Sequence, residues 1–324
     1  MNSRISERFH SGENLAKNLL LIDGITRSGK SVLSHVIGTF ENTEHIQFYP
    51  PLEHLMAGVA LGSVEMDFAR AFLTSQLNEL TYNSMLGRNI NFRASDQTGV
   101  PNHPRFEMYK MRLEQSEGDH IVEQLRVGKN LFPFLTHDVM VNYEIFEVLL
   151  PEAKVIEIYR NPILNIRSWY LKGYGNRFSN DPRCFTLNLS EGFEPVPWYA
   201  ESQENIWRSF NNMERCVLIV THLIRKSISQ QNLRKRDLVL TISHEDLVQE
   251  TDRVIEGIET FIGQKRTAAS SIQLSKENCP RKIDANIEKL FLREIRSSTR
   301  QSLVTDLESL VEDFKDNVYG FCKK

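Results

Sequence analysis

Near the start of the chain, a short apolar run leads directly into a glycine-containing loop and then into a helical pattern, and few folds accommodate that succession. Residues 19–22 read Leu-Leu-Leu-Ile, and residues 24–31 (GITRSGKS) satisfy the pattern GxxxxGK[ST]. Apolar residues at helical spacing follow in 32–40. In such a unit, backbone N–H groups turn toward an anion at the positive end of a helix, and a lysine reaches the outer oxygens. An ordinary strand-to-helix turn with a solvated Arg27 and Lys30 is the alternative, which the complete motif disfavours.

Similar short apolar runs recur along the chain and are each followed by helical spacing, at 45–49, 131–135, 155–159 and 238–242. Strands that alternate with helices predict crossover connections and a mostly parallel sheet. We therefore expect a three-layer α/β fold of the P-loop type, with a mostly parallel central sheet flanked by helices, in one domain over residues 1–324.

Several segments outside the predicted sheet have their own patterns. Residues 52–125 lack strand alternation and predict a helical insertion, and apolar stripes predict helices over 206–228 and within a C-terminal helical region at about 284–320. Residues 91–105 and 173–197 are rich in Gly and Pro, which predicts long loops of the kind that form lids or binding walls.

Composition excludes several classes of protein. Lys+Arg number 39 and Asp+Glu 42, so no overall basic field attracts nucleic acid or a membrane, and any anion site must be local. The four cysteines are far apart, which favours reduced thiols over a zinc cluster or a disulfide framework. The polar first 18 residues are unlike a signal peptide and no run of about 18 apolar residues occurs, so a soluble, cytoplasmic protein is expected.

A second candidate anion site follows the run at 155–159. Asn161 and Pro162 predict a helix start, because Asn caps helices and Pro suits the first helical position. Arg160 then lies at the carboxyl end of a strand, where ligands bind in such sheets and where a guanidinium can hold phosphate oxygens. Ser168 lies eight residues further along, in the same predicted helix.

Three elements, in order, resemble the sulfotransferases that use 3′-phosphoadenosine 5′-phosphosulfate (PAPS). The loop Thr26-Arg27-Ser28-Gly29 is similar to their 5′-phosphosulfate loop, and Arg160-Asn161-Pro162 with Ser168 is similar to their 3′-phosphate motif. Residues 238–247, followed by 261–263, resemble their strand, Glu-Asp-Leu and Phe-Leu-Gly signature. The resemblance implies that PAPS is the donor and PAP the product, that the loop residues Thr26, Arg27, Ser28, Gly29, Lys30 and Ser31 hold one end of the nucleotide, and that Arg160 and Ser168 hold the 3′-phosphate.

The chain departs from that family at three places. Lys30 stands where most members have Thr, which completes a kinase-like motif, and His244 replaces a Tyr. The Arg-Lys-Gly tail of cytosolic members has no clear counterpart, and Arg281-Lys282 is a poor substitute for it.

Transfer of a sulfuryl group needs cations near the developing charge and a base near the acceptor. Arg27 and Lys30 are the candidate cations. His137 follows the run at 131–135 and resembles the Thr-His of cytosolic sulfotransferases, which implies that it is the base; Asp138 is the second candidate. The histidines show no HxxxH or HExxH spacing, so no metal is expected.

Three functions remain open on the sequence. The favoured one is a sulfotransferase that moves a sulfuryl group from PAPS to a hydroxyl or amine of a small-molecule or glycan acceptor, with residues 52–125 and 173–197 walling the acceptor pocket. The second is an ATP- or GTP-dependent small-molecule kinase, in which Ser31 would ligate Mg²⁺. The third is a nucleotide-binding module without catalysis. No nucleic-acid or membrane partner is expected, and the sequence does not indicate an oligomeric state.

Overall fold

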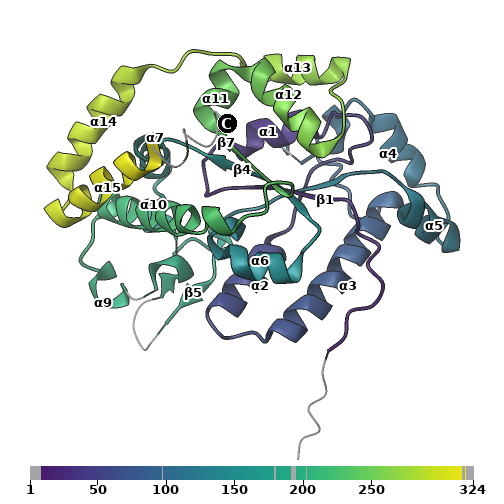
Figure 1. The fold of residues 1–324 in the computed structure, drawn as a ribbon, viewed down its shortest axis with the longest axis horizontal. Coiled ribbons are helices and arrows are strands. Elements are labelled where there is room, and N and C mark those ends of the chain that lie inside the picture. The colour runs from purple at the N-terminus through teal and green to yellow at the C-terminus, as the bar shows by residue number, and fades with distance from the viewer. Residues whose placement is uncertain are drawn as a thin grey trace, which may run out of the picture.

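A five-stranded parallel sheet forms the centre of the molecule (Figure 1). The computed structural model describes residues 9–315 and 318, apart from 97, 179, 191–194 and 202. The strands, in spatial order, are β2 (Gln47–Phe48), β3 (Phe132–Leu135), β1 (Leu19–Asp23), β4 (Lys154–Tyr159) and β7 (Val239–Ser243), and all neighbouring pairs are parallel. All five coincide with the apolar runs of the sequence, and the predicted α/β fold is confirmed. Only β2 is much shorter than its run.

Helices cover both faces of this sheet, because alternate strand residues point to opposite sides. One face presents Leu20, Ile22 and Ile156 to α1 (Lys30–Ile37), α11 (His244–Gln249), α12 (Thr251–Ile262) and α13 (Ala268–Lys276). The other face presents Leu21, Phe134 and Val155 to helices from the segment between β2 and β4. Sheet residues 20–22 are completely buried, which matches the continuous apolar runs of a parallel sheet covered on both sides.

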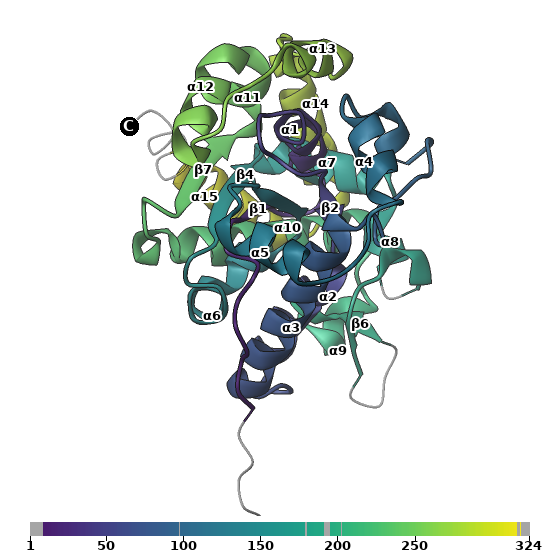
Figure 2. The same ribbon diagram turned by 90° about the vertical axis from the view of Figure 1, so that its right-hand side faces the viewer.

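Between β2 and β3 the described residues form four helices joined by irregular stretches, and the longest of these, 86–105, contains a 3-10 turn at Val100–Asn102. The helical insertion predicted over 52–125 is therefore interrupted by the loop that was predicted over 91–105. Its helices are α2 (Pro50–Ala60), α3 (Met66–Met85), α4 (Phe106–Arg112) and α5 (Asp119–Val127). The buried apolar residues of α2 and α3 belong to the same cluster as Leu21 and Phe134, so these helices are part of the layer that covers the sheet. In Figure 2, α2 and α3 lie beneath the level of α1, on the side where β6 and α9 also lie.

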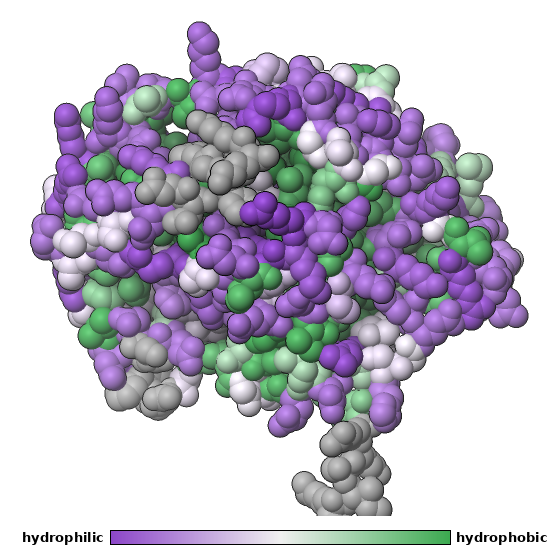
Figure 3. Space-filling view, in the orientation of Figure 1, coloured by the Kyte–Doolittle hydropathy of each residue, from purple (hydrophilic) through white to green (hydrophobic). Residues whose placement is uncertain are grey.

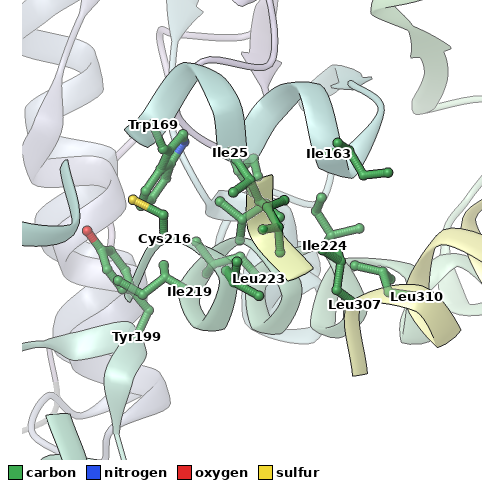
Figure 4. Packing of buried hydrophobic residues seen from close by; sticks show 14 of the residues in the cluster. Ile25, Ile163, Trp169, Tyr199, Cys216, Ile219, Leu223, Ile224, Leu307 and Leu310 are labelled. Atoms are coloured by element: carbon green, nitrogen blue, oxygen red, sulfur yellow. The ribbon is translucent and has the colours of Figure 1, made fainter. Parts of the chain in front are cut away.

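A third apolar cluster lies beyond β4 and is built from helices that follow it. It joins α7 (Pro162–Leu171) to α10 (Asn212–Ser229), α14 (Ala285–Ser298) and α15 (Gln301–Phe314). Figure 4 shows Trp169 and Tyr199 at one end of this cluster and Leu307 and Leu310 at the other, with Ile25 between them. Because Ile25 belongs to the glycine-containing loop, this cluster anchors that loop to α7 and α10.

The helix expected over 206–228 begins later than its apolar stripe indicates. The Asn211 side chain accepts a hydrogen bond from the backbone N–H of Glu214, and the Glu214 side chain accepts one from the backbone N–H of Asn211, so a capping box starts α10 at Asn212. Ile206 lies instead in a separate short helix, α9 (Glu204–Trp207), and is 43% exposed. The predicted start was therefore wrong.

The segment 173–197 is largely irregular in its described part, but it contains short elements. These are α8 (Tyr174–Arg177), a 3-10 turn at Pro182–Cys184 and the antiparallel pair β5 (Asn188–Leu189) and β6 (Val196–Pro197), followed by a 3-10 turn at Trp198–Ala200. The remaining elements are α6 (Tyr143–Leu149) and 3-10 turns at Val139–Asn142 and Gln231–Leu233.

The surface seen in Figure 3 is predominantly hydrophilic, with hydrophobic residues in scattered groups. Within the described ranges, no helix has both the length and the apolar content needed to cross a membrane. Cys184, Cys216 and Cys279 are free thiols, and Cys322 lies outside the described residues.

Candidate active site

The loop between β1 and α1 has a backbone that requires glycine at both of its glycine positions. Gly24 has φ +141°, and a Cβ there would lie 2.3 Å from the carbonyl oxygen of Ile158. Gly29 has φ +108°, and its Cβ would lie 2.3 Å from the ring of His244. Since neither conformation nor space admits a side chain, the loop can bring its backbone N–H groups close to an anion.

Neighbouring side chains fix the rest of this loop. The indole N–H of Trp169 on α7 donates to the Thr26 carbonyl oxygen at 2.6 Å. The hydroxyl of Ser28 is buried and has no hydrogen-bond partner. A buried hydroxyl without a partner is costly, so Ser28 is prepared to contact a ligand held by the loop. Ser31 is the second residue of α1 and so belongs to the first turn, where backbone N–H groups are free.

Lys30 does not extend toward a cavity in this structure. Its ammonium group is buried and donates to the carbonyl oxygens of Gly24 and, at 2.8 Å, of Ile25. Burial lowers the pKa of Lys30, while the carboxyl groups of Asp23 and Asp138 act in the opposite direction. Lys30 thus ties the ends of its own loop together and lies close to several acids.

Arg160, Ser168 and Arg27 meet on the other side of the loop. Asn161 accepts hydrogen bonds from the backbone N–H groups of residues 163 and 164, so it caps α7 as predicted, with Pro162 as the first helical residue. The Nε of Arg27 donates to Ser168 Oγ at 3.0 Å, and Arg160 donates to the Arg27 carbonyl oxygen at 3.1 Å. The Nε of Arg160 is buried without a partner, which leaves a donor for a ligand.

These three residues line a cavity of about 400 Å³, which we call the basic cavity. Its other charged lining residues are Arg167, Lys172, Arg281, Lys282 and Asp284, so cations greatly outnumber acids. Burial lowers the pKa of Arg160, and the neighbouring Arg27, Arg281 and Arg167 lower it further, against the opposing charge of Glu245. Such a concentration of positive charge favours a polyanionic ligand.

Arg281 and Lys282 were expected to be a poor substitute for a basic tail, yet the structure places both at the basic cavity. The backbone N–H of Arg281 donates to the carbonyl oxygen of Val248 in α11, which holds residues 281–282 beside the strand β7 and its following helix. Both side chains line the basic cavity with Arg160 and Ser168. The only sequence signal for this placement was two adjacent basic residues after a proline.

His137 and Asp138 follow β3 and line a second cavity, of about 340 Å³. We call it the aromatic cavity because six aromatic side chains line it: Phe48, Tyr174, Phe178, Phe185, Trp198 and Tyr199. The turn that carries His137 is fixed by Asp23, which accepts hydrogen bonds from the hydroxyl of Thr136 at 2.8 Å and from the backbone N–H of Met140 at 3.0 Å. The end of β1 therefore positions the end of β3.

Glu53 of α2 holds His137 in place, and the sequence gave no indication of this pairing. One oxygen of Glu53, Oε1, accepts the backbone N–H of His137 at 2.6 Å and lies 3.0 Å from its Nδ1. Burial raises the pKa of Glu53 to about 8. Burial, and then the charge of Lys30, lower the pKa of His137 well below its usual value, so its ring is neutral near pH 7.

Asp138 is the second acid at the base of this cavity. Burial raises its pKa well above the usual range, and its Oδ1 is buried without a hydrogen-bond partner. Its backbone has φ +58°, which is uncommon for a residue with a side chain. Over the ranges that the structure describes, no group of three or more His, Cys, Asp and Glu side chains is arranged to hold a metal ion.

The two cavities meet at the loop, because consecutive residues line different cavities: Thr26 lines the aromatic cavity and Arg27 the basic cavity. This arrangement can hold an anionic ligand on one side of the loop and a second molecule, beside a neutral imidazole, on the other. Group transfer across the loop is the chemistry that it suits.

Comparison with known proteins identifies the family of this chain. The model of the sulfotransferase domain family matches residues 19–307, whereas a search among curated proteins found no match. The sulfotransferase domain of the Synechococcus PCC 7002 olefin synthase is 19% identical, with 95% of this chain and 98% of that chain covered and a TM-score of 0.45. Mouse sulfotransferase SULT7A1, solved with PAP, is 13% identical, with coverages of 96% and 89% and a TM-score of 0.43.

Proposed function

The chain belongs to the sulfotransferase family, and we propose that it moves a sulfuryl group from PAPS to a hydroxyl or amine of a small-molecule or glycan acceptor, releasing PAP. The observation that carries this proposal is the division of the site by the loop. Arg27 contributes to the basic cavity and Thr26 to the cavity that contains His137. A donor in the basic cavity and an acceptor in the aromatic cavity would therefore meet at the loop, where neighbouring residues line the two cavities.

Two unsatisfied groups support a 3′-phosphorylated nucleotide as the donor. The buried Ser28 hydroxyl and the buried Nε of Arg160 each lack a partner, and they lie at different ends of the site, in the loop and in the basic cavity. PAPS supplies an activated sulfuryl group at its 5′ end and a phosphate at its 3′ position. The loop from Thr26 to Ser31 would hold the first, and Arg160, Ser168 and Arg281 the second.

His137 is the base in this proposal, and Glu53 is a positioning residue. In this proposal Oε1 is the carbonyl oxygen of the protonated Glu53 and accepts from both the backbone N–H and the ring Nδ1–H of His137, so Nδ1 carries the proton. The lone pair of Nε2 is then available to take the proton of the acceptor. The guanidinium of Arg27 would stabilise charge that develops on the donor side, and Lys30 would stabilise the loop from within.

A thermal-shift comparison tests the donor. PAP is expected to raise the melting temperature more than adenosine 5′-phosphate, which lacks the 3′-phosphate, because a ligand that binds only the folded state stabilises it. Arg160→Gln should remove most of this selectivity, by roughly tenfold in the ratio of dissociation constants, as for loss of a charge-assisted hydrogen bond. Arg88→Gln changes an exposed arginine that lines neither cavity, and it serves as the control.

The same experiment addresses the other functions. The complete GxxxxGK[ST] motif also suits ATP, so a preference for Mg·ATP over PAP would overturn the proposal in favour of phosphoryl transfer. Unchanged selectivity in Arg160→Gln would show that the second anion site is misplaced. Binding of PAP without release of PAP from PAPS in the presence of a broad acceptor panel would favour a non-catalytic module.

A further inference from the structure

The aromatic cavity exposes apolar side chains at its mouth. Phe185 is 66% exposed and Phe48 is 42% exposed, although both border a cavity. Phe48 also contacts the ring of His137 edge-on, with 5.3 Å between the ring centres. Exposed aromatic rings that converge on a polar group are typical of a binding site for an apolar or aromatic ligand.

Two polar groups of the outer wall already have partners within the protein, whereas Asp138 at the base of the cavity keeps one carboxyl oxygen without a partner. The Nε2 of His54 lies 2.7 Å from the carbonyl oxygen of Phe185, and the hydroxyl of Thr186 donates to the carbonyl oxygen of Cys184 at 3.2 Å. A sugar exposes hydroxyl groups on every side and needs many free partners to replace water. This wall therefore suits a flat ring better than a carbohydrate.

The mouth of the cavity also carries a net positive charge. Arg177 and Arg183 both line it, and both bind the same carboxylate, Asp181, at 3.0 Å and 2.8 Å. The two guanidinium groups lower the pKa of Asp181, so it stays ionised, and two positive charges face one negative charge. Arg183 is the more accessible of the pair, with 81% of its side chain exposed.

We propose that the acceptor is an aromatic hydroxyl compound that carries a carboxylate, with its ring against the aromatic wall, its hydroxyl beside His137 and its carboxylate at Arg183 and Arg177. This inference rests on the proposed function and specifies its acceptor. In the reaction, the phenolic proton passes to Nε2 of His137, the phenolic oxygen forms a bond to sulfur, and the bond from sulfur to the phosphate oxygen of PAPS breaks. The products are an aryl sulfate and PAP.

Three matched probes test the proposal: 3-(4-hydroxyphenyl)propanoate, its amide and tyramine. They share the phenol and differ in the charge of the tail. With PAPS as donor, kcat/KM is expected to be highest for the propanoate, lower for the amide and lowest for tyramine. In Arg183→Gln, the ratio of kcat/KM for propanoate over amide should fall by roughly fivefold, the size expected for one exposed charge pair, and the effect should weaken with added salt.

Arg88→Gln is the matched control, because it removes an exposed arginine away from the cavity, and it should keep the wild-type ratio. Equal rates for propanoate and amide, or an unchanged ratio in Arg183→Gln, would overturn the carboxylate assignment. Turnover of methyl β-glucoside without turnover of any of the three phenols would overturn the assignment of an aromatic acceptor. Selective stabilisation by PAP is measured separately, so failure here is distinguishable from failure of the proposed donor.

Discussion

Glu53→Gln removes a carboxyl that titrates inside the protein while it keeps an oxygen able to accept both hydrogen bonds of His137. The pKa of Glu53 is raised from 4.5 to about 8 by burial. Between about pH 4.5 and pH 8, Glu53 therefore keeps its proton in the folded protein and has lost it in the unfolded chain. The free energy of unfolding consequently falls as pH rises through this range. The contribution is complete below about pH 4.5 and is lost as pH rises through about 8.

The magnitude follows from the size of the shift. One pKa unit corresponds to about 1.4 kcal/mol, so the shift is equivalent to at most about 5 kcal/mol, of which roughly 3 kcal/mol falls between about pH 5 and pH 8. The variant has no titrating group at this position. Other buried groups titrate in both proteins, so the difference between the two curves isolates Glu53.

Urea denaturation of the ligand-free protein at a series of pH values measures this difference. The stability of Glu53→Gln relative to wild type should rise by roughly 3 kcal/mol from about pH 5 to pH 8. Glu114→Gln, the same change at an exposed position, should follow the wild-type curve throughout. Parallel curves for wild type and Glu53→Gln would refute the reasoning, because they would mean that Glu53 titrates alike in the folded and unfolded states.

Two further substitutions test the loop and the base. His137→Ala should lower turnover by roughly 10²-fold or more, while PAP still stabilises the protein. The control His54→Ala, in the same cavity, should lower turnover much less. Similar losses of turnover in the two variants would remove His137 as the base. Gly29→Ala should destabilise the protein by roughly 1–3 kcal/mol and abolish its stabilisation by PAP, because the new Cβ would meet the ring of His244. Retained PAP binding in a thermal-shift assay would contradict the loop geometry.

The sheet was predictable because each buried parallel strand corresponds to a short, mostly apolar run of consecutive residues in the sequence. A mostly apolar run of four or five residues sufficed to locate β1, β3, β4 and β7. The start of α10 was missed because the apolar stripe was extended through Phe210, although Asn211 and Glu214 have the spacing of a capping box. Local hydrogen bonding at a helix end decided the boundary, and periodicity did not.

The site was predictable only where one local motif carries it. The loop residues and the pair of Arg160 and Ser168 have fixed spacing, and the structure brings them together through Arg27. Glu53 and Arg281 have no such spacing with their partners. Glu53 reaches His137 across 84 positions in sequence, because α2 packs beside the end of β3. Such pairs depend on how helices pack on the sheet, which local patterns do not encode.

The division of the site by its loop has a consequence for how the enzyme can be altered. The walls of the aromatic cavity come from α2 and from residues 174–199, whereas the basic cavity is built from α7 and residues 281–287. The two sets still touch, because Trp169 of α7 packs against Tyr174 and Phe178 and also holds the loop. The acceptor preference is therefore best altered at exposed side chains that line only the aromatic cavity, such as Phe185, which leaves Glu53, Trp169 and the basic cavity unchanged.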